Sequence, residues 1–173
     1  MNKIPKIGIA LSGASGRAVA HIGVLEVLKE NNIPIDIIVG CSSGALVAAS
    51  FATDTLEELK ETLYSLNLRK VLSLWSTKKA KGGLFHLNNP KINQWLKKFT
   101  KGKKFEEVTP RLGFVATDLD TAELITLSTG DLGKAFKATS AVPGLFEPVV
   151  WDKRILVDGG LVNIVPTLAA KEM

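Results

Sequence analysis

The chain has 173 residues, 46% of them hydrophobic, and a formal net charge of +5. This length suits one ordered domain, since a chain of about 150 residues buries roughly 68 to 70% of its unfolded surface. The sequence argues against a membrane-spanning class, because no apolar stretch approaches the roughly 18 residues of a transmembrane helix. Cys41 is the one cysteine and can form no internal disulfide. We therefore expect a protein of a reducing compartment, the cytoplasm.

Strand-like apolar runs alternate with helical patterns in the first part of the chain. Residues 6–11 predict a buried strand, and residues 17–31 predict a helix whose apolar side chains recur at spacings of three and four. Residues 35–39 predict a second buried strand, and a helix of small residues follows Ser42. This order indicates an α/β sandwich with parallel strands, right-handed crossovers and ligand sites at the carboxyl ends of the strands.

The later part of the chain adds mainly strands. We expect two strands joined by a short turn, then a helix, then two last strands, at residues 112–118, 123–128, 131–139, 149–150 and 155–157. No internal repeat and no linker interrupts this pattern. The sequence therefore predicts a single domain over residues 1–173.

Residues 62–105 differ from the rest of the chain in charge. They hold 11 of the 22 Lys and Arg residues and none of the 17 Asp and Glu residues, so this stretch carries +11 and the remainder carries 11 − 17 = −6. Ile92, Trp95, Leu96 and Phe99 share one face of an expected helix within it.

Two interpretations of this basic stretch stay open. It is either a surface insertion, about residues 65–108, whose apolar stripe packs on the core, or a lid-like patch that docks on an anionic membrane. In the second case the contact would run from Arg69 to Lys104, with lysines attracted to the headgroups and aromatic rings seated among them. No nucleic-acid partner is expected, because beyond charge the sequence has no recognisable binding motif.

The segment Gly40-Cys41-Ser42-Ser43-Gly44 places a serine between two glycines, between an apolar run and a helix. This is the layout of a nucleophile elbow, a tight strand-to-helix turn that exposes the serine hydroxyl above the sheet. The glycines remove side chains that would collide with the turn. Ser42 would be the nucleophile, and the Ser43 amide at the positive end of the new helix would face a developing oxyanion.

A serine nucleophile needs a base, and the chain has only two histidines, His21 and His86. Neither follows a late strand, as the histidine of an α/β-hydrolase triad does, so a conventional triad is not expected. Asp158 ends an apolar strand and could reach across the sheet edge toward Ser42, where burial would raise its pKa and make it a base. The alternative is a plain turn, because Asp-Gly is a common turn dipeptide.

Four segments in register resemble the patatin-like phospholipases over essentially the whole chain. They are the loop LSGASGRA at 11–18, the elbow at 40–44, TSAVPG at 139–144, and Asp158-Gly159-Gly160 followed by Asn163 and Pro166. The resemblance implies a three-layer α/β sandwich with a mostly parallel central sheet. It also implies a catalytic dyad with Ser42 as nucleophile and Asp158 as base, without a metal or organic cofactor.

The same resemblance implies an oxyanion hole built from backbone amides of the first loop. The residues concerned are Gly13, Ala14, Ser15 and Gly16, with Arg17 matching the basic residue of the family. Ala14 and Ala18 stand where glycines are usual, and a methyl group there disfavours positive φ and would narrow the site. The chain also stops inside an expected helix where similar proteins continue, which indicates a natural truncation or a fragment.

The function expected from these motifs is hydrolysis of a lipid or other acyl ester through an acyl-enzyme on Ser42. The alternative is a catalytically weak lipid-binding or regulatory module at a membrane surface, an interpretation motivated by Ala14 and Ala18. The expected location is the cytoplasm, with peripheral contact at the inner membrane surface. No metal site is expected, because Asp118, Asp120 and Glu123 surround a turn where acidic side chains are mostly solvated.

Overall fold

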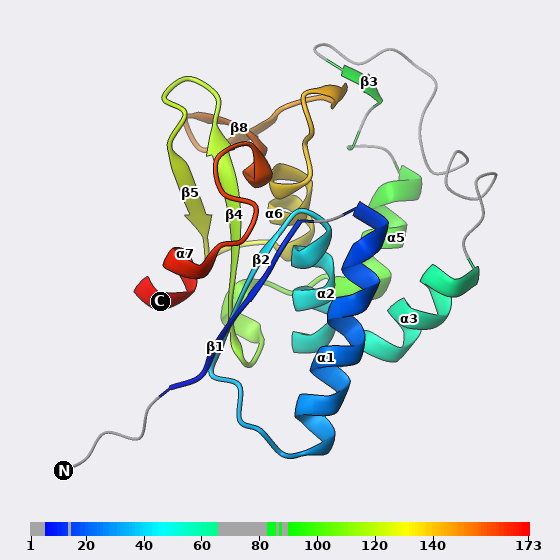
Figure 1. Cartoon of the computed structure of the whole chain (residues 1–173). Coiled ribbons are helices and arrows are strands. Elements are labelled where there is room, and N and C mark those ends of the chain that lie inside the picture. Colours follow the sequence, from blue (N-terminus) through cyan, green and yellow to red (C-terminus); the bar gives the residue numbers. More distant parts are fainter. Residues whose placement is uncertain (1–5, 14, 66–82, 86, 88–89) are drawn as a thin grey trace.

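The computed structural model describes residues 6–13, 15–65, 83–85, 87 and 90–173. These residues form a six-stranded sheet in the order β1-β2-β4-β8-β7, with β5 also paired to β4, and a separate pair of β3 with β6 (Figure 1). The strands are β1 (Gly8–Leu11), β2 (Ile37–Cys41), β3 (Gly83–Phe85), β4 (Arg111–Asp118), β5 (Leu124–Leu127), β6 (Gly144–Phe146), β7 (Val149–Trp151) and β8 (Arg154–Asp158).

Helices cover both faces of the sheet, which gives three layers (Figure 1). They are α1 (Val19–Glu30), α2 (Ser43–Ala52), α3 (Leu56–Ser65), α5 (Pro90–Thr100), α6 (Leu132–Thr139) and α7 (Thr167–Glu172). Of the α-helices in the described part of the chain, α7 alone packs on the second face, and the main core lies between the sheet and the other helices. Along β2 the side chains alternate between the two layers, because Ile38 belongs to the main core while Val39 faces α7.

The central strands β1, β2 and β4 are parallel, as the alternation of strands and helices predicts. The expected pair of strands at 112–118 and 123–128 is also confirmed, as β4 and β5. β2 differs in its bounds, because it continues to Cys41 and so leads directly into Ser42. The first helix begins later than expected, since residues 15–18 form a 3-10 turn before α1.

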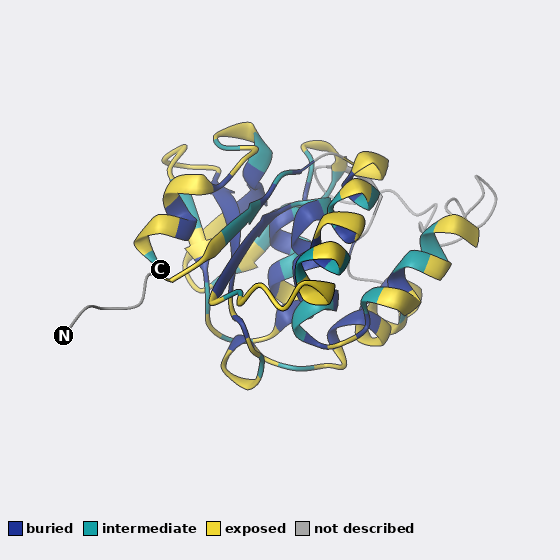
Figure 2. Cartoon of the chain, turned by 60° about the horizontal axis from the view of Figure 1, so that its bottom comes forward, coloured by how far each residue is buried: buried dark blue, intermediate teal, exposed yellow. Residues whose placement is uncertain are grey.

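Helix α2 lies at the centre of the main core and is buried on all sides, as Figure 2 shows for the inner helices. Its small residues let it approach the sheet and its neighbouring helices closely. The helices that surround it are α1, α3, α5 and α6. This position fixes the start of α2, and therefore the turn that carries Ser42.

The second half of the sheet is antiparallel, and this brings two strand ends together. Three strands pair with β4. β5 pairs with residues 114–117 of β4, β8 with residues 116–118 and β2 with residues 111–115. A strand has two edges, so β5 occupies one of them and β2 and β8 share the other. β2 and β8 therefore run toward each other, and they end opposite Val115 and Ala116 respectively.

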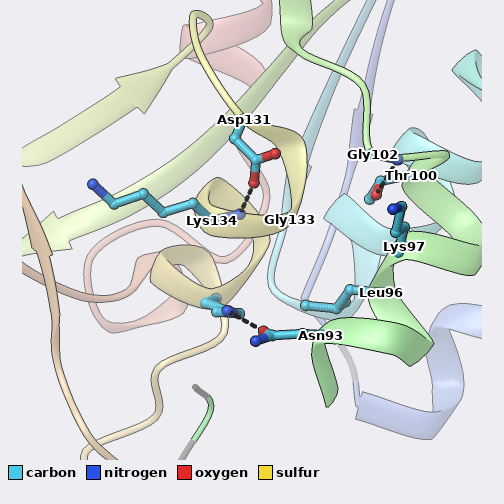
Figure 3. Close-up of a pocket in the computed structure, with 9 residues that line it drawn as sticks. Asn93, Leu96, Lys97, Thr100, Gly102, Asp131, Gly133 and Lys134 are labelled. Carbon is cyan, nitrogen blue, oxygen red and sulfur yellow. Dashed lines mark hydrogen bonds between the residues drawn. The ribbon is translucent and has the colours of Figure 1, made fainter. Parts of the chain in front are cut away.

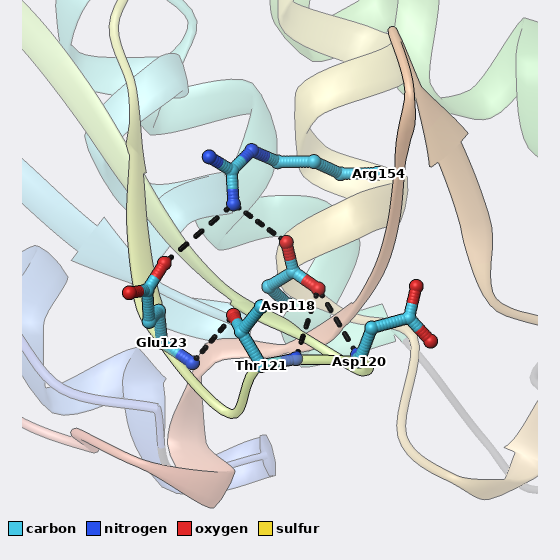
Figure 4. A network of polar contacts seen from close by, with 5 residues as sticks. All are labelled: Asp118, Asp120, Thr121, Glu123 and Arg154. Carbon is cyan, nitrogen blue, oxygen red and sulfur yellow. Dashed lines mark hydrogen bonds and ion pairs between the residues drawn. The ribbon is translucent and has the colours of Figure 1, made fainter.

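An ion pair ties β8 to β4 where β8 begins (Figure 4). Asp118 is buried, and its Oδ2 atom lies 2.6 Å from Nη1 of Arg154. Its Oδ1 atom accepts hydrogen bonds from the amides of Asp120 and Thr121, and Glu123 lies 3.7 Å from the same guanidinium. The hydrogen bond from Arg154 is the main cause that lowers the pKa of Asp118. The expectation that Asp118 is solvated is therefore wrong, because this carboxylate is buried and binds Arg154, which links β4 to β8.

The described part of the basic stretch packs its apolar side chains on the core and leaves most of its lysines exposed. Helix α5 buries Ile92, Leu96 and Phe99, while Trp95 packs at the edge of the same cluster with its ring 4.9 Å from that of Phe99. This agrees with the interpretation of an apolar stripe packed on the core. Residues 66–82 of the expected insertion lie outside the described residues.

Among the described residues, no helix is both long enough and apolar enough to cross a membrane.

Candidate active site

Ser42 occupies a strained turn between β2 and α2. Its φ of 50° and ψ of −123° are a conformation that non-glycine residues rarely adopt, at a cost of about 1–3 kcal/mol. A Cβ atom on Gly40 would lie 2.4 Å from Cα of Ala45, and one on Gly44 would lie 2.5 Å from the carbonyl oxygen of Leu11. Neither glycine has a positive φ, so both are needed for space alone. These contacts have the form of a nucleophile elbow.

Ser42 and Asp158 line one cavity of about 600 Å³. The cavity is also lined by residues of the first loop, of the segment after α6 and of the segment after β8, namely Gly13, Ser15, Gly16, Arg17, Val142, Gly160, Leu161 and Ile164. The two candidate catalytic residues meet here because β2 and β8 run toward each other along one edge of β4 and end at neighbouring residues of it. The juxtaposition expected from the sequence is thus present, although it arises from two strands of opposite direction.

The Asp158 carboxyl group is buried, with 6% of the residue exposed. Its Oδ1 atom accepts a hydrogen bond of 2.7 Å from the Gly160 amide, which orients the carboxylate. Its Oδ2 atom is buried and has no partner of ordinary hydrogen-bond geometry among the described residues. Burial raises the pKa of Asp158, and the nearby Ser42 hydroxyl and the Gly160 amide act in the opposite direction. A carboxylate with a raised pKa beside a serine hydroxyl is suited to accept its proton.

The two glycines after Asp158 make room for this arrangement. A Cβ atom on Gly159 would lie 2.3 Å from the carbonyl oxygen of Val115, and one on Gly160 would lie 2.9 Å from Oδ1 of Asp158. The short 3-10 turn that begins at Gly159 therefore sits directly on β4. Asp158 caps this turn through Oδ1, as the plain-turn alternative expects, and its role as a base stays a prediction.

The first loop only partly matches the expected oxyanion hole. The Gly13 amide donates to the carbonyl oxygen of Ile164 at 3.1 Å, so the expectation that it is a free oxyanion donor is not met. Ser15, with a φ of 48°, lines the cavity together with Gly16 and Arg17. Ala14 lies outside the described residues.

Two further residues named from the sequence are Ala18, which stands where the family usually has a glycine, and Ser43, whose amide is an expected oxyanion donor. Ala18 has a φ of −59°, so this position does not need a glycine. Ser43 begins α2, whose positive end points to the elbow. The oxyanion role of the Ser15, Gly16, Arg17 and Ser43 amides stays a prediction.

The histidines and Cys41 have other surroundings. Nε2 of His21 lies 3.1 Å from the carbonyl oxygen and 3.2 Å from the hydroxyl of Ser12, so His21 braces the start of the first loop. His86 lies outside the described residues. Cys41 is the last residue of β2 rather than a turn residue, and its side chain is fully buried.

Cys41 is expected to resist alkylation in the folded protein. Burial, followed by the charge of Asp158, raises the pKa of its thiol to about 12, although the Gly13 amide acts in the opposite direction. At pH 8 the thiolate fraction is then about 10⁻⁴. Iodoacetamide should modify Cys41 in denaturant but not in the native protein, and mass spectrometry of the intact protein measures this. Equal rates in the two states would contradict its burial.

A second cavity, of about 400 Å³, lies between α5 and α6 (Figure 3). Its polar groups are mutually engaged: Lys137 donates to Asn93, and the Asp131 carboxylate accepts from the Lys134 amide at the start of α6. Lys134 also places its ammonium group 4.7 Å from the centre of the Trp151 ring. None of the motif residues lines this cavity, so it is not the candidate active site.

The lysines after α5 lie at the end of α6 that is remote from Ser42. Lys103 accepts a hydrogen bond from the amide of Leu132, the first residue of α6, whereas Thr139 at the other end contacts Ser42. An eight-residue helix separates the two ends by about 12 Å. Membrane contact through the basic stretch stays a prediction.

The family of the chain follows from comparison with known proteins. A family model described as Patatin-like phospholipase matches residues 9–171. The chain belongs to this family. Among its relatives are an uncharacterized NTE family protein of Mycobacterium tuberculosis, 32% identical over 94% of this chain and 44% of the relative, and a patatin-like phospholipase domain-containing protein of Caenorhabditis elegans, 30% identical over 92% of this chain and 12% of the relative.

A solved structure with a similar fold is found by structure comparison. The crystal structure of VipD from Legionella pneumophila superposes with a TM-score of 0.60 over 93% of this chain and 46% of that chain, at 15% identity. This likeness supports the α/β fold. The chain spans less than half the length of the curated relatives it matches.

Thr139 also contacts the elbow, and the sequence does not single it out as a site residue. Thr139 is fully buried, and its hydroxyl accepts a hydrogen bond of 2.9 Å from the Ser42 amide. The only signal for it in the sequence was its place in the TSAVPG segment at 139–144.

Proposed function

We propose that this patatin-like chain is a serine lipid acyl hydrolase that uses Ser42 and Asp158 as a catalytic dyad. The observation that carries the proposal is the strained Ser42 turn facing a buried carboxylate of raised pKa within one cavity. A serine needs such a base to become a nucleophile, and no histidine of the described residues lines this cavity.

The reaction would proceed in two steps. Ser42 Oγ attacks the carbonyl carbon of the ester while its proton passes to Oδ2 of Asp158, the oxygen that Gly160 does not hold. The tetrahedral intermediate collapses when the alcohol leaves with that proton, and the acyl group stays on Ser42. Water then attacks the acyl-enzyme with Asp158 again as base, and the fatty acid leaves.

The lining of the cavity supports an acyl substrate with an anionic headgroup. Val142, Leu161 and Ile164 supply an apolar wall, and more than half of Leu161 and of Ile164 is exposed. Arg17 is an exposed cation in the same lining, suited to a phosphate or another anionic group of the substrate. This combination favours phospholipids or lysophospholipids over esters without charge.

Ser42→Ala is expected to abolish hydrolysis, because the attacking oxygen is removed. Wild type and variant would be given p-nitrophenyl esters of increasing acyl length and a fluorophosphonate probe whose adduct is located by mass. Wild type should release p-nitrophenol and carry the adduct on Ser42. Ser128→Ala serves as a matched control, since Ser128 does not line the cavity.

Two results would contradict the proposal. Equal release of p-nitrophenol by wild type and Ser42→Ala would remove Ser42 from the reaction. A wild type that neither hydrolyses esters nor reacts with the probe, but binds phospholipid vesicles, would instead support the lipid-binding module.

A further inference from the structure

The hydroxyl of Thr139 makes hydrogen bonds to two backbone groups, one in the elbow and one in β4. Thr139 is the last residue of α6 and has no exposed surface. Its Oγ1 atom accepts a hydrogen bond of 2.9 Å from the Ser42 amide and donates one of 2.5 Å to the carbonyl oxygen of Val115. A hydroxyl can do both at once because it has one proton and two lone pairs.

This contact lies where the ladder between β2 and β4 ends. The parallel register places Cys41 opposite Val115, so Ser42 is the first residue that leaves the ladder. The Thr139 hydroxyl stands between the Ser42 amide and the Val115 carbonyl. It thereby links the turn to the sheet at the point where the backbone departs from strand geometry.

The same place supports Asp158. The next residue of β4, Ala116, is opposite Asp158, and Gly159 approaches the Val115 carbonyl so closely that a Cβ atom would lie 2.3 Å from its oxygen. The Asp158 amide donates to the carbonyl oxygen of Ala141 at 3.0 Å, two residues after Thr139. Residues 139–141 therefore hydrogen-bond to the backbones of both Ser42 and Asp158, through Thr139 and Ala141.

We propose that Thr139 is a positioning residue for the dyad, and that its hydroxyl holds the Ser42 backbone in the strained turn that directs Oγ at Asp158. This inference rests on the proposed function of Ser42 and Asp158. A strained conformation persists only where its surroundings fix it, and the hydrogen bond to the Ser42 amide acts directly on that conformation. Without the hydroxyl, both the Ser42 amide and the Val115 carbonyl lose their partner in a buried place.

The test compares Thr139→Val, which keeps the shape and removes the hydroxyl, with Thr139→Ser, which keeps the hydroxyl. We expect Thr139→Val to lower kcat and the rate of fluorophosphonate labelling at Ser42 about 10- to 100-fold, and Thr139→Ser to stay within about threefold of wild type. KM should change little in both, because Thr139 does not line the cavity. A merely structural role would lower the folded fraction of Thr139→Val without changing kcat per folded molecule.

Several outcomes would overturn the inference. They are labelling of folded Thr139→Val at the wild-type rate, and an equal loss of activity in Thr139→Ser. Should Thr139→Val not fold, hydrogen exchange of the wild type decides: the Ser42 amide should be strongly protected, and exchange at the rate of an exposed amide would refute the bond. Failure of the proposed function is distinct, because wild type itself would then not be labelled at Ser42.

Discussion

Replacing Asp158 with asparagine is expected to lower kcat/KM about 10⁴-fold, the upper end of what a general base contributes. Asparagine keeps an oxygen that accepts from the Gly160 amide, so the turn should survive. It cannot take the proton of Ser42. In the wild type, activity should fall as the pH drops through the pKa of Asp158, which burial places above its ordinary value of 3.8. A pH profile of kcat/KM measures that pKa in the free enzyme.

The same substitution should not destabilise the fold at pH 7. Because burial raises the folded-state pKa, the charged Asp158 carboxylate is disfavoured in the folded state relative to the unfolded chain. The free energy of unfolding of wild type relative to Asp158→Asn should therefore rise as the pH falls through the raised pKa toward 3.8. Other carboxylates, such as Asp118, cancel in this difference.

Urea unfolding at several pH values measures this difference. Asp152→Asn is the control, since Asp152 is exposed at a φ of 53° that asparagine also tolerates. It should change neither kcat/KM nor the pH dependence of stability appreciably. An active Asp158→Asn would remove Asp158 as the base. If Asp158→Asn and wild type showed the same pH dependence of the free energy of unfolding, the raised pKa of Asp158 would be contradicted.

Gly40→Ala is expected to cost at least about 3 kcal/mol of folding free energy, or to prevent folding. Its Cβ atom would lie 2.4 Å from Cα and 2.6 Å from the nitrogen of Ala45, so the first turn of α2 would have to move. That turn belongs to a helix that is buried on all sides, so its neighbours would prevent the movement.

Gly16→Ala provides the matched control for this substitution. Gly16 lines the same cavity, has no positive φ, and a Cβ atom on it would meet nothing within 4 Å. Its free energy of unfolding should therefore stay within about 1 kcal/mol of wild type. Chemical denaturation of both variants makes the comparison, and similar stability of the two would show that the elbow does not require space at Gly40.

The parts of the molecule that could be predicted are those that depend on residues close together in the sequence. The alternation of apolar runs and helical periods predicted β1, α1, β2 and α2, and the glycines at 40 and 44 predicted the tight turn of Ser42. The stripe of α5 followed from spacing alone. Asp158 could be proposed because the absence of a suitable histidine left the carboxylate at the end of an apolar run.

The parts that could not be predicted depend on contacts between distant segments. Thr139 and Ser42 are separated by 97 positions, and nothing in either local sequence indicates their hydrogen bond. The bond from Gly13 to Ile164 likewise joins two irregular segments and removes one expected oxyanion donor. The burial of Asp118 depends on Arg154, which the strand pairing brings beside it.

The shared edge of β4 makes strand length a determinant of the chemistry. β8 advances about 3.4 Å for each residue, and it is held at its beginning by Arg154 and Asp118. One residue more between that ion pair and Asp158 would turn the carboxylate to the opposite face of the sheet. Two more would carry the strand end into the space that β2 occupies along β4. The distance between nucleophile and base thus depends on the number of residues in β8 between the ion pair and Asp158.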